Sequence, residues 1–236
     1  RIKEFLSIRG IEFKSIDVAN DNDGMAALQA LGARSVPVVS KGDKFVFAQN
    51  IRDVVEFLGI KEDVGPKLSQ AELAARGDMI WQAATHYVRQ MPQSALAKEL
   101  PNRPRSYRVL MHHIFQIPTA FLGARRAGKP LVYEQLVAPP PEDMQTPDSI
   151  AAFGEAMRLD FKAWSESEGP DICTGEMATY YGKQQAHEVL ERTVWHSTQH
   201  VRQVMSLLEM EGVQPAQPLP ESAFDKLPLP LKIWDE

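Results

Sequence analysis

The fold of most of this chain is decided by the stretch Trp195–Val204, which reads WHSTQHVRQV. It lies in a segment, about residues 183–210, whose apolar residues recur at helical spacing. His196 and His200 are four residues apart, so they lie one turn apart on one helix face. Apolar residues such as Val204 share that face, which we therefore expect to point into a core. Two inward imidazoles at this spacing can share one metal ion.

Three more long helical segments precede this one, at about residues 69–90, 104–126 and 148–166. Ser69 and Glu72 form a capping box at the start of the first of them. Four amphipathic helices of this length predict a four-helix bundle, which we place at residues 68–212. The proline-rich tail, residues 213–236, is expected to lie extended, either on this bundle or on a neighbouring molecule.

The second helical segment carries the adjacent histidines His112 and His113, which point about 100° apart on a helix. His113 falls on the apolar stripe and is expected in the core, whereas His112 falls on the polar side and is expected to face water. His113, His196 and His200 are therefore predicted to converge inside the bundle. Three neutral nitrogen ligands with a vacant position are typical of a catalytic metal site.

The alternative interpretation is that each inward histidine is a hydrogen-bonded core residue without a metal. For the remaining candidates the pattern predicts supporting roles or none. We expect His86 either at the surface or in contact with a metal ligand, and His187 facing outward. Glu191 is expected to be exposed, or else to support a metal ligand, and Cys173 is expected to be an inert thiol in a loop.

The first part of the chain, residues 1–62, has a different pattern. Short apolar runs predict helix, strand, helix, strand, strand and helix in turn. The predicted elements are a helix at 2–6, a strand at 11–18, a helix at 25–31, strands at 36–39 and 45–47, and a helix at 50–58. Gly65 and Pro66 mark a short linker to the bundle.

The chain has 236 residues, a net charge of −5 and one cysteine. A mildly acidic chain argues against nucleic acid as a partner. One cysteine excludes a disulfide framework, a CxxC pair within these residues and a multi-thiolate zinc site. No apolar run is long enough for a membrane span, and we expect a protein of the reducing cytoplasm.

The bundle resembles the DinB/YfiT-like superfamily of metal-binding four-helix bundles over residues 69–212. That superfamily carries one histidine on its second helix and a closing HxxxH followed by Gln and an apolar residue, which Gln203 and Val204 match. The resemblance implies that His113, His196 and His200 are the metal ligands, with His112 as an alternative to its neighbour. It also implies a homodimer. Zinc is the first choice for three histidines, and nickel, iron and manganese stay open.

Residues 1–60 resemble a glutaredoxin. The stretch Arg34–Val39, RSVPVV, is similar to the loop in which a cis-proline follows the residue that pairs with a bound thiol peptide. This resemblance implies thiol binding by Val36 and Pro37.

The CxxC motif and the interior strand before it are absent, so we expect the native chain to extend before Arg1. The alternative is a degenerate domain whose gap another segment or a partner chain fills. Phe47–Asn50 lacks the signature that holds glutathione, which weakens the expectation for that thiol specifically.

The sequence thus predicts an α+β multidomain protein, in which an incomplete thioredoxin-like domain precedes a DinB-like bundle. Similar bundles include mycothiol and bacillithiol S-transferases and a thiol-dependent maleylpyruvate isomerase. We therefore expect a metal-dependent transferase or isomerase that uses a low-molecular-weight thiol, such as glutathione, and an electrophilic substrate. The catalytic residues stay unknown. The alternative is a non-catalytic metal-binding stress-response or binding protein.

Overall fold

The structure is a computed structural model that describes residues 2–101 and 103–234. The expected start of the glutaredoxin-like domain at Arg1 and the last two residues of the tail lie outside the described residues. The chain divides between Gly65 and Pro66 into two compact units. We call residues 1–65 the N-terminal unit and residues 66–236 the helical unit, and we treat each by itself.

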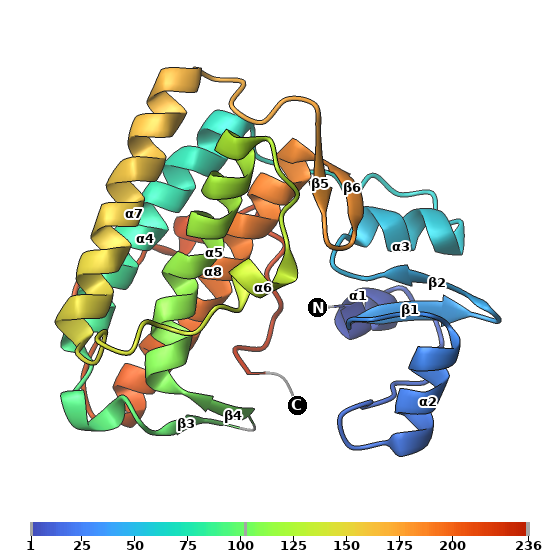
Figure 1. Ribbon diagram of the computed structural model, residues 1–236, viewed down its shortest axis with the longest axis horizontal. Coiled ribbons are helices and arrows are strands. Elements are labelled where there is room, and N and C mark those ends of the chain that lie inside the picture. The colour runs from blue at the N-terminus through green and yellow to red at the C-terminus, as the bar shows by residue number, and fades with distance from the viewer. Residues whose placement is uncertain (1, 102, 235–236) are drawn as a thin grey trace. The chain divides into compact units, whose positions relative to one another are not determined.

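The N-terminal unit combines three helices and a β-hairpin (Figure 1). Its elements are α1 (Ile2–Ile8), α2 (Asn22–Ala30), β1 (Val38–Lys41), β2 (Lys44–Phe47) and α3 (Ile51–Leu58). The strands pair antiparallel with Val38 opposite Phe47, across a turn in which Gly42 has a φ of 65°. Asn50 caps α3 by accepting a hydrogen bond from the Arg52 amide at 2.9 Å. The predicted hairpin and last helix are thus confirmed.

The strand predicted at residues 11–18 is wrong, because residues 11–17 form no regular secondary structure. A strand is stable only when a neighbouring strand pairs with its backbone groups. Among the described residues, the N-terminal unit has only β1 and β2, and these two pair with each other. Phe13 and Ile16 consequently remain about two-fifths exposed, at 41% and 43%.

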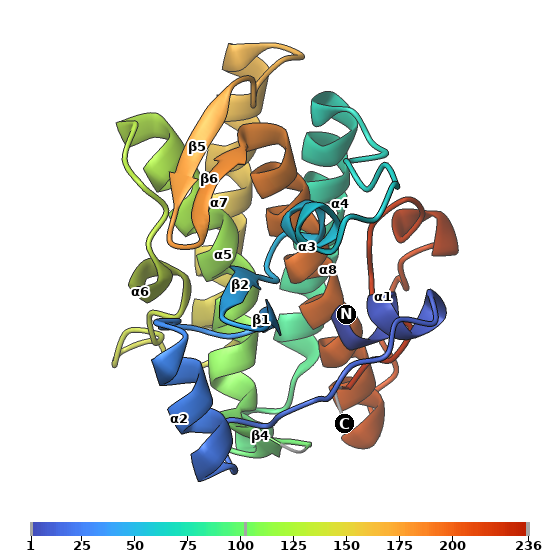
Figure 2. The same cartoon turned by 90° about the vertical axis from the view of Figure 1, so that its right-hand side faces the viewer.

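The helical unit is built on four long helices that pack around one core (Figures 1 and 2). They are α4 (Gln70–Gln90), α5 (Tyr107–Ala127), α7 (Pro147–Glu168) and α8 (Ala186–Met210). Helices α4 and α5 each pack against both α7 and α8. The capping box predicted at Ser69 and Glu72 is present, and both of its hydrogen bonds are formed. The four predicted long helices are confirmed.

Two of these helices begin later than predicted because short hairpins precede them. The hairpins are β3 (Glu99–Leu100) with β4 (Arg103–Ser106), and β5 (Glu176–Thr179) with β6 (Gly182–Gln185). Helix α5 begins after Ser106, whose side chain accepts a hydrogen bond from the Val109 amide. Further short elements are η1 (Gln93–Ala95), α6 (Tyr133–Leu136) and η2 (Glu221–Ala223).

The proline-rich tail packs on the helices of its own chain. Ala223 and Leu227 are buried in the core of the helical unit. The Arg76 guanidinium donates to the Ala223 carbonyl at 2.7 Å, and the Tyr87 hydroxyl donates to the Gln217 carbonyl at 3.1 Å. Apart from η2, the described part of the tail forms neither helix nor strand, and it contains turns and bends with a positive φ at Gln217 and Lys226. The surface on which it docks is the helical unit of its own chain.

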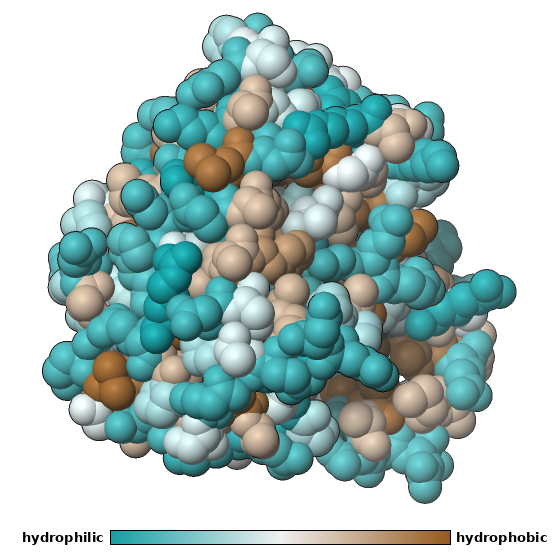
Figure 3. Space-filling view, turned by 60° about the vertical axis from the view of Figure 1, so that its left-hand side comes forward, coloured by the Kyte–Doolittle hydropathy of each residue, from teal (hydrophilic) through white to brown (hydrophobic). Residues whose placement is uncertain are grey.

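Within the described part of the chain, no helix combines the length and the apolar character needed to cross a membrane. Figure 3 shows a face on which hydrophilic residues predominate and apolar residues occur in small groups. The large apolar side chains lie instead in the core of the helical unit, where Trp81, Phe121 and Phe161 are almost fully buried.

Candidate metal centre

Three histidines from two neighbouring helices converge in the helical unit. His113 lies on α5, while His196 and His200 lie one turn apart on α8. One ring nitrogen of each lies within 4.8 Å of those of the other two. The ring centroids of His196 and His200 are 4.8 Å apart, and that of His113 lies 5.5 Å and 5.2 Å from them. The structure thus brings together the three residues that the sequence pattern selected.

The orientation of His200 is fixed by Gln203, one turn further along α8. The Nδ1 atom of His200 lies 2.7 Å from Oε1 of Gln203, and Nε2 of the same amide donates to the Ile233 carbonyl at 3.0 Å. Because an amide oxygen only accepts, Nδ1 of His200 carries the ring proton. The lone pair therefore resides on Nε2 of His200, as a metal ligand requires.

The other two histidines are held by different contacts. His113 forms a hydrogen bond with the backbone of Leu136, the last residue of α6. The His196 ring stacks on Trp195, with centroids 5.5 Å apart and planes at 27°. Among the described residues, the buried Nδ1 of His196 has no hydrogen-bond partner. A buried polar atom without a hydrogen bond lowers the stability of a folded protein by about 1–3 kcal/mol. A metal ion bound at this atom would offset that loss.

Burial keeps His113 and His196 neutral at physiological pH. It lowers the pKa of His113 to about 2, with the neighbouring His200 acting in the same direction. Burial, followed by His200 and Arg192, lowers the pKa of His196 well below its ordinary value. Neutral imidazoles have the lone pairs that a divalent metal needs. In donor type and number, and in the closeness of their ring nitrogens, the three histidines could hold a divalent metal ion.

The prediction that His112 faces water is wrong. Its side chain is only 3% exposed, and its ring stacks on Phe153 of α7, with centroids 5.1 Å apart and planes at 17°. Burial lowers the pKa of His112 to about 4. Helix α5 contacts both α7 and α8. Two faces of α5 are therefore buried, whereas the prediction assumed that only its apolar stripe is. The histidine cluster contains His113 and not His112.

Two further expectations about α8 need correction. Glu191, for which an exposed position was expected first, is only 8% exposed. His187, expected to face outward, is half-buried, and its Nε2 lies 2.9 Å from the Leu68 carbonyl. Helix α8 contacts α4, α5 and both strands of the β5–β6 hairpin, so it is covered over much of its circumference.

The remaining candidates lie outside the cluster. His86 is half-buried on α4, where it acts electrostatically on Glu155 of α7. Cys173 is 1% exposed, and burial raises its pKa to about 12. A thiol in such a position has almost no thiolate at neutral pH, as expected for an inert cysteine.

Sequence reasoning missed two arginines beside the triad. Arg192 precedes His196 by four residues, so the same helical spacing could have found it. Arg105 lies on β4, where no helical periodicity signals its orientation. Both lower the pKa of His196 through their positive charge, and Arg105 also lowers that of His113.

The glutaredoxin-like loop lies in the N-terminal unit. The Val36–Pro37 peptide bond is cis, and the Val36 side chain is 51% exposed. The Val36 carbonyl accepts a hydrogen bond from Nε2 of Gln49 at 3.1 Å, and the Pro37 carbonyl accepts one from the Ala48 amide at 2.8 Å. These bonds hold the loop against the segment that follows β2.

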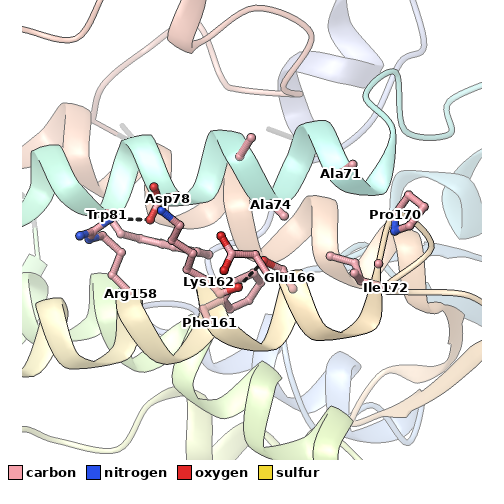
Figure 4. Close-up of a pocket in the computed structure, with 13 residues that line it drawn as sticks. Ala71, Ala74, Asp78, Trp81, Arg158, Phe161, Lys162, Glu166, Pro170 and Ile172 are labelled. Atoms are coloured by element: carbon pink, nitrogen blue, oxygen red, sulfur yellow. Dashed lines mark hydrogen bonds and ion pairs between the residues drawn. The ribbon is translucent and has the colours of Figure 1, made fainter.

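A separate pocket of about 480 Å³ lies between α4 and α7 (Figure 4). Its walls include the apolar Trp81 and Phe161, and its rim carries an ion pair between Arg158 and Asp78 at 2.6 Å. None of its lining residues belongs to the histidine triad. The Arg158 guanidinium also binds Glu155, and the charged residues that line the pocket are two of each sign: Asp78 and Glu166 against Arg158 and Lys162.

Comparison with known proteins supports the assignment of the first part of the chain. Residues 1–46 match the family model for glutaredoxin. No curated protein shows significant similarity to the chain. The protein therefore consists of a glutaredoxin-like domain followed by a packed helical region that contains a buried histidine triad.

Proposed function

We propose that the protein is a metal-dependent transferase or isomerase of the DinB-like class that uses a low-molecular-weight thiol. The observation that carries this proposal is the approach of His113, His196 and His200 to within 4.8 Å of one another through their ring nitrogens. A glutaredoxin-like domain in the same chain supports it, because glutaredoxins also handle small thiols.

The three histidines are preorganised to bind one divalent ion. Burial keeps His113 and His196 neutral, and Gln203 and the backbone of Leu136 orient the rings of His200 and His113. Zinc suits three imidazoles best, and nickel, iron and manganese follow. When bound, the ion supplies an electrophilic centre that keeps a coordinated thiol deprotonated at neutral pH.

The chemistry then needs no separate general base. In a transfer, the thiolate sulfur forms a bond to an electrophilic carbon while the leaving group departs with the electron pair of its bond to that carbon. In an isomerisation, the sulfur adds to a conjugated C=C bond, whose π pair moves onto the carbonyl, and after rotation the pair returns as the thiolate leaves. The thiol proton goes to solvent. In this proposal Val36 and Pro37 of the glutaredoxin-like domain contact a thiol such as glutathione, and the enzyme acts in the cytoplasm as a homodimer.

Cobalt substitution tests this proposal, because cobalt(II) reports thiolate binding by a charge-transfer band. Full-length protein loaded with cobalt(II) is titrated with 2-mercaptoethanol. We expect one cobalt per chain and a band that saturates at one thiolate per cobalt. His196→Ala should lose the cobalt, whereas the matched control His86→Ala, on a different helix, should keep both signals. Cobalt binding without any response to thiol would overturn the enzymatic proposal and favour a non-catalytic metal-binding protein.

A further inference from the structure

Arg192 lies beside the triad and is held in place by two tyrosines. It precedes His196 by one helical turn, so both side chains emerge on the same side of α8. Its Nη2 donates to the Tyr180 hydroxyl at 3.2 Å, and its Cζ lies 5.5 Å from the centroid of the Tyr181 ring. Among the described residues, its buried Nε has no hydrogen-bond partner. Arg192 is thus fixed in position while one of its donors stays unused.

Arg105 is a second cation beside the triad. It lies on β4, directly before the residue that caps α5, and its side chain is half-buried. In the described part of the chain, no carboxylate or other group forms a hydrogen bond or ion pair with it. Burial and the nearby Arg103 lower the pKa of Arg105, which indicates a guanidinium that is partly desolvated without compensation.

Tyrosine side chains lie between the two arginines. Tyr133 acts electrostatically on Arg105, and its ring centroid lies 5.3 Å from that of Tyr180, whose hydroxyl binds Arg192. Two backbone hydrogen bonds of 2.9 Å join Leu131 to the β5–β6 hairpin and fix this arrangement. We call Arg105, Tyr133, Tyr180, Tyr181 and Arg192 the arginine–tyrosine rim.

The rim makes the surroundings of the triad positive. Among the groups that act electrostatically on His113 and His196, the permanently charged ones are Arg105 and, for His196, Arg192. A divalent ion at the triad would add to this charge. Partly buried positive charges are costly without an anion beside them. Guanidinium groups are also well suited to bind a carboxylate through two parallel hydrogen bonds.

We propose that the arginine–tyrosine rim binds a carboxylate of the ligand whose sulfur occupies the metal centre, so that the preferred thiol is anionic. This inference rests on the proposed thiol-dependent function and adds the charge of the substrate to it. The planar guanidinium of Arg192, supported by Tyr180 and Tyr181, provides the fixed donor, and Arg105 provides the second cation.

The test uses three thiols of similar length and different charge. Cobalt(II)-loaded full-length protein is titrated with 3-mercaptopropionate, 1-propanethiol and cysteamine, and the charge-transfer band gives each affinity. We expect 3-mercaptopropionate to bind at least about tenfold more tightly than 1-propanethiol, and cysteamine to bind most weakly. In Arg192→Met and in Arg105→Met, the ratio of the first two affinities should fall about tenfold. Arg126→Met, which removes an exposed partner of Asp160, is the matched control and should keep the ratio.

The outcomes separate this inference from the proposed function. A failure of all three thiols to produce the band would contradict the thiol-dependent function itself. Equal binding of all three, or an unchanged ratio in both arginine variants, would overturn the role of the rim. If Arg192→Met does not fold or load cobalt, Arg192→Lys decides, because it keeps the charge but loses the planar pair of donors and should still reduce the ratio.

Discussion

The Nδ1 atom of His200 lies 2.7 Å from the side-chain oxygen of Gln203. The nitrogen of the same amide donates to the Ile233 carbonyl in the C-terminal tail. The tail therefore fixes which way the Gln203 amide points, and the amide fixes the tautomer of His200. A segment more than 30 residues away along the chain thus contributes to the orientation of a candidate metal ligand.

Replacing Gln203 should weaken metal binding without abolishing it. In Gln203→Met the proton on Nδ1 of His200 loses its acceptor, and we expect the affinity for zinc to fall about 10- to 100-fold. Competition with a chromophoric chelator at pH 7 measures this change. Gln82→Met, at an exposed position on α4, is the control and should bind zinc like the original protein. Equal affinities in the two variants would show that Gln203 does not support His200.

Removing the end of the tail should act through the same amide. A chain ending at Leu229 loses the carbonyls that bind Gln199, Arg202 and Gln203. We expect zinc affinity to fall several-fold in the original sequence but hardly at all in the Gln203→Met background, because both changes remove one interaction. The same competition assay measures all four proteins. Fully additive losses would contradict the coupling between the tail and His200.

The four long helices and the triad could be predicted because both follow from one periodicity. The spacing of apolar residues defined the inward face of α8, and His196 and His200 lie on that face. The local capping signal at Ser69 and Glu72 also held, since it depends only on neighbouring residues. The same reasoning selected His113 over His112 as the member of the cluster.

The features that sequence reasoning missed depend on neighbours that are distant in the chain. The burial of His112 depends on Phe153 of α7, which covers the more polar side of α5. The predicted strand at residues 11–18 is absent because its alternating apolar residues supply no partner, and the only described strands of this unit, β1 and β2, pair with each other. The orientation of Arg105 likewise follows from a hairpin that was not predicted.

Packing between α5 and α7 makes Gly154 sensitive to substitution. A methyl group there would lie 2.5 Å from Cζ of Phe115, so Gly154→Ala should destabilise the helical unit by about 1–3 kcal/mol. Gly123→Ala is the matched control in α5, because its methyl group would meet nothing within 4 Å. The control should gain about 0.5–1 kcal/mol from improved helix propensity. Urea unfolding measures both values, and equal effects would contradict the close contact with Phe115.

Cys173 should resist alkylation in the folded protein. Its pKa of about 12 lies far above pH 8, so the thiolate fraction at pH 8 is about one in ten thousand, and its side chain is buried. Labelling with iodoacetamide, followed by mass spectrometry, should be slow in buffer and rapid in denaturant. Raising the pH from 7 to 9 should increase the rate about tenfold per unit as thiolate forms. Rapid, pH-independent labelling of the folded protein would show that the thiol is accessible and activated.

The central claim is that His113, His196 and His200 hold one metal ion to which a thiolate binds. Zinc K-edge X-ray absorption of the full-length, untagged protein tests it most directly. We predict three imidazole nitrogens at about 2.0–2.1 Å, and one additional sulfur at about 2.3 Å after addition of 2-mercaptoethanol. Fewer than three imidazoles, or a coordination sphere that does not change with thiol, would contradict this account.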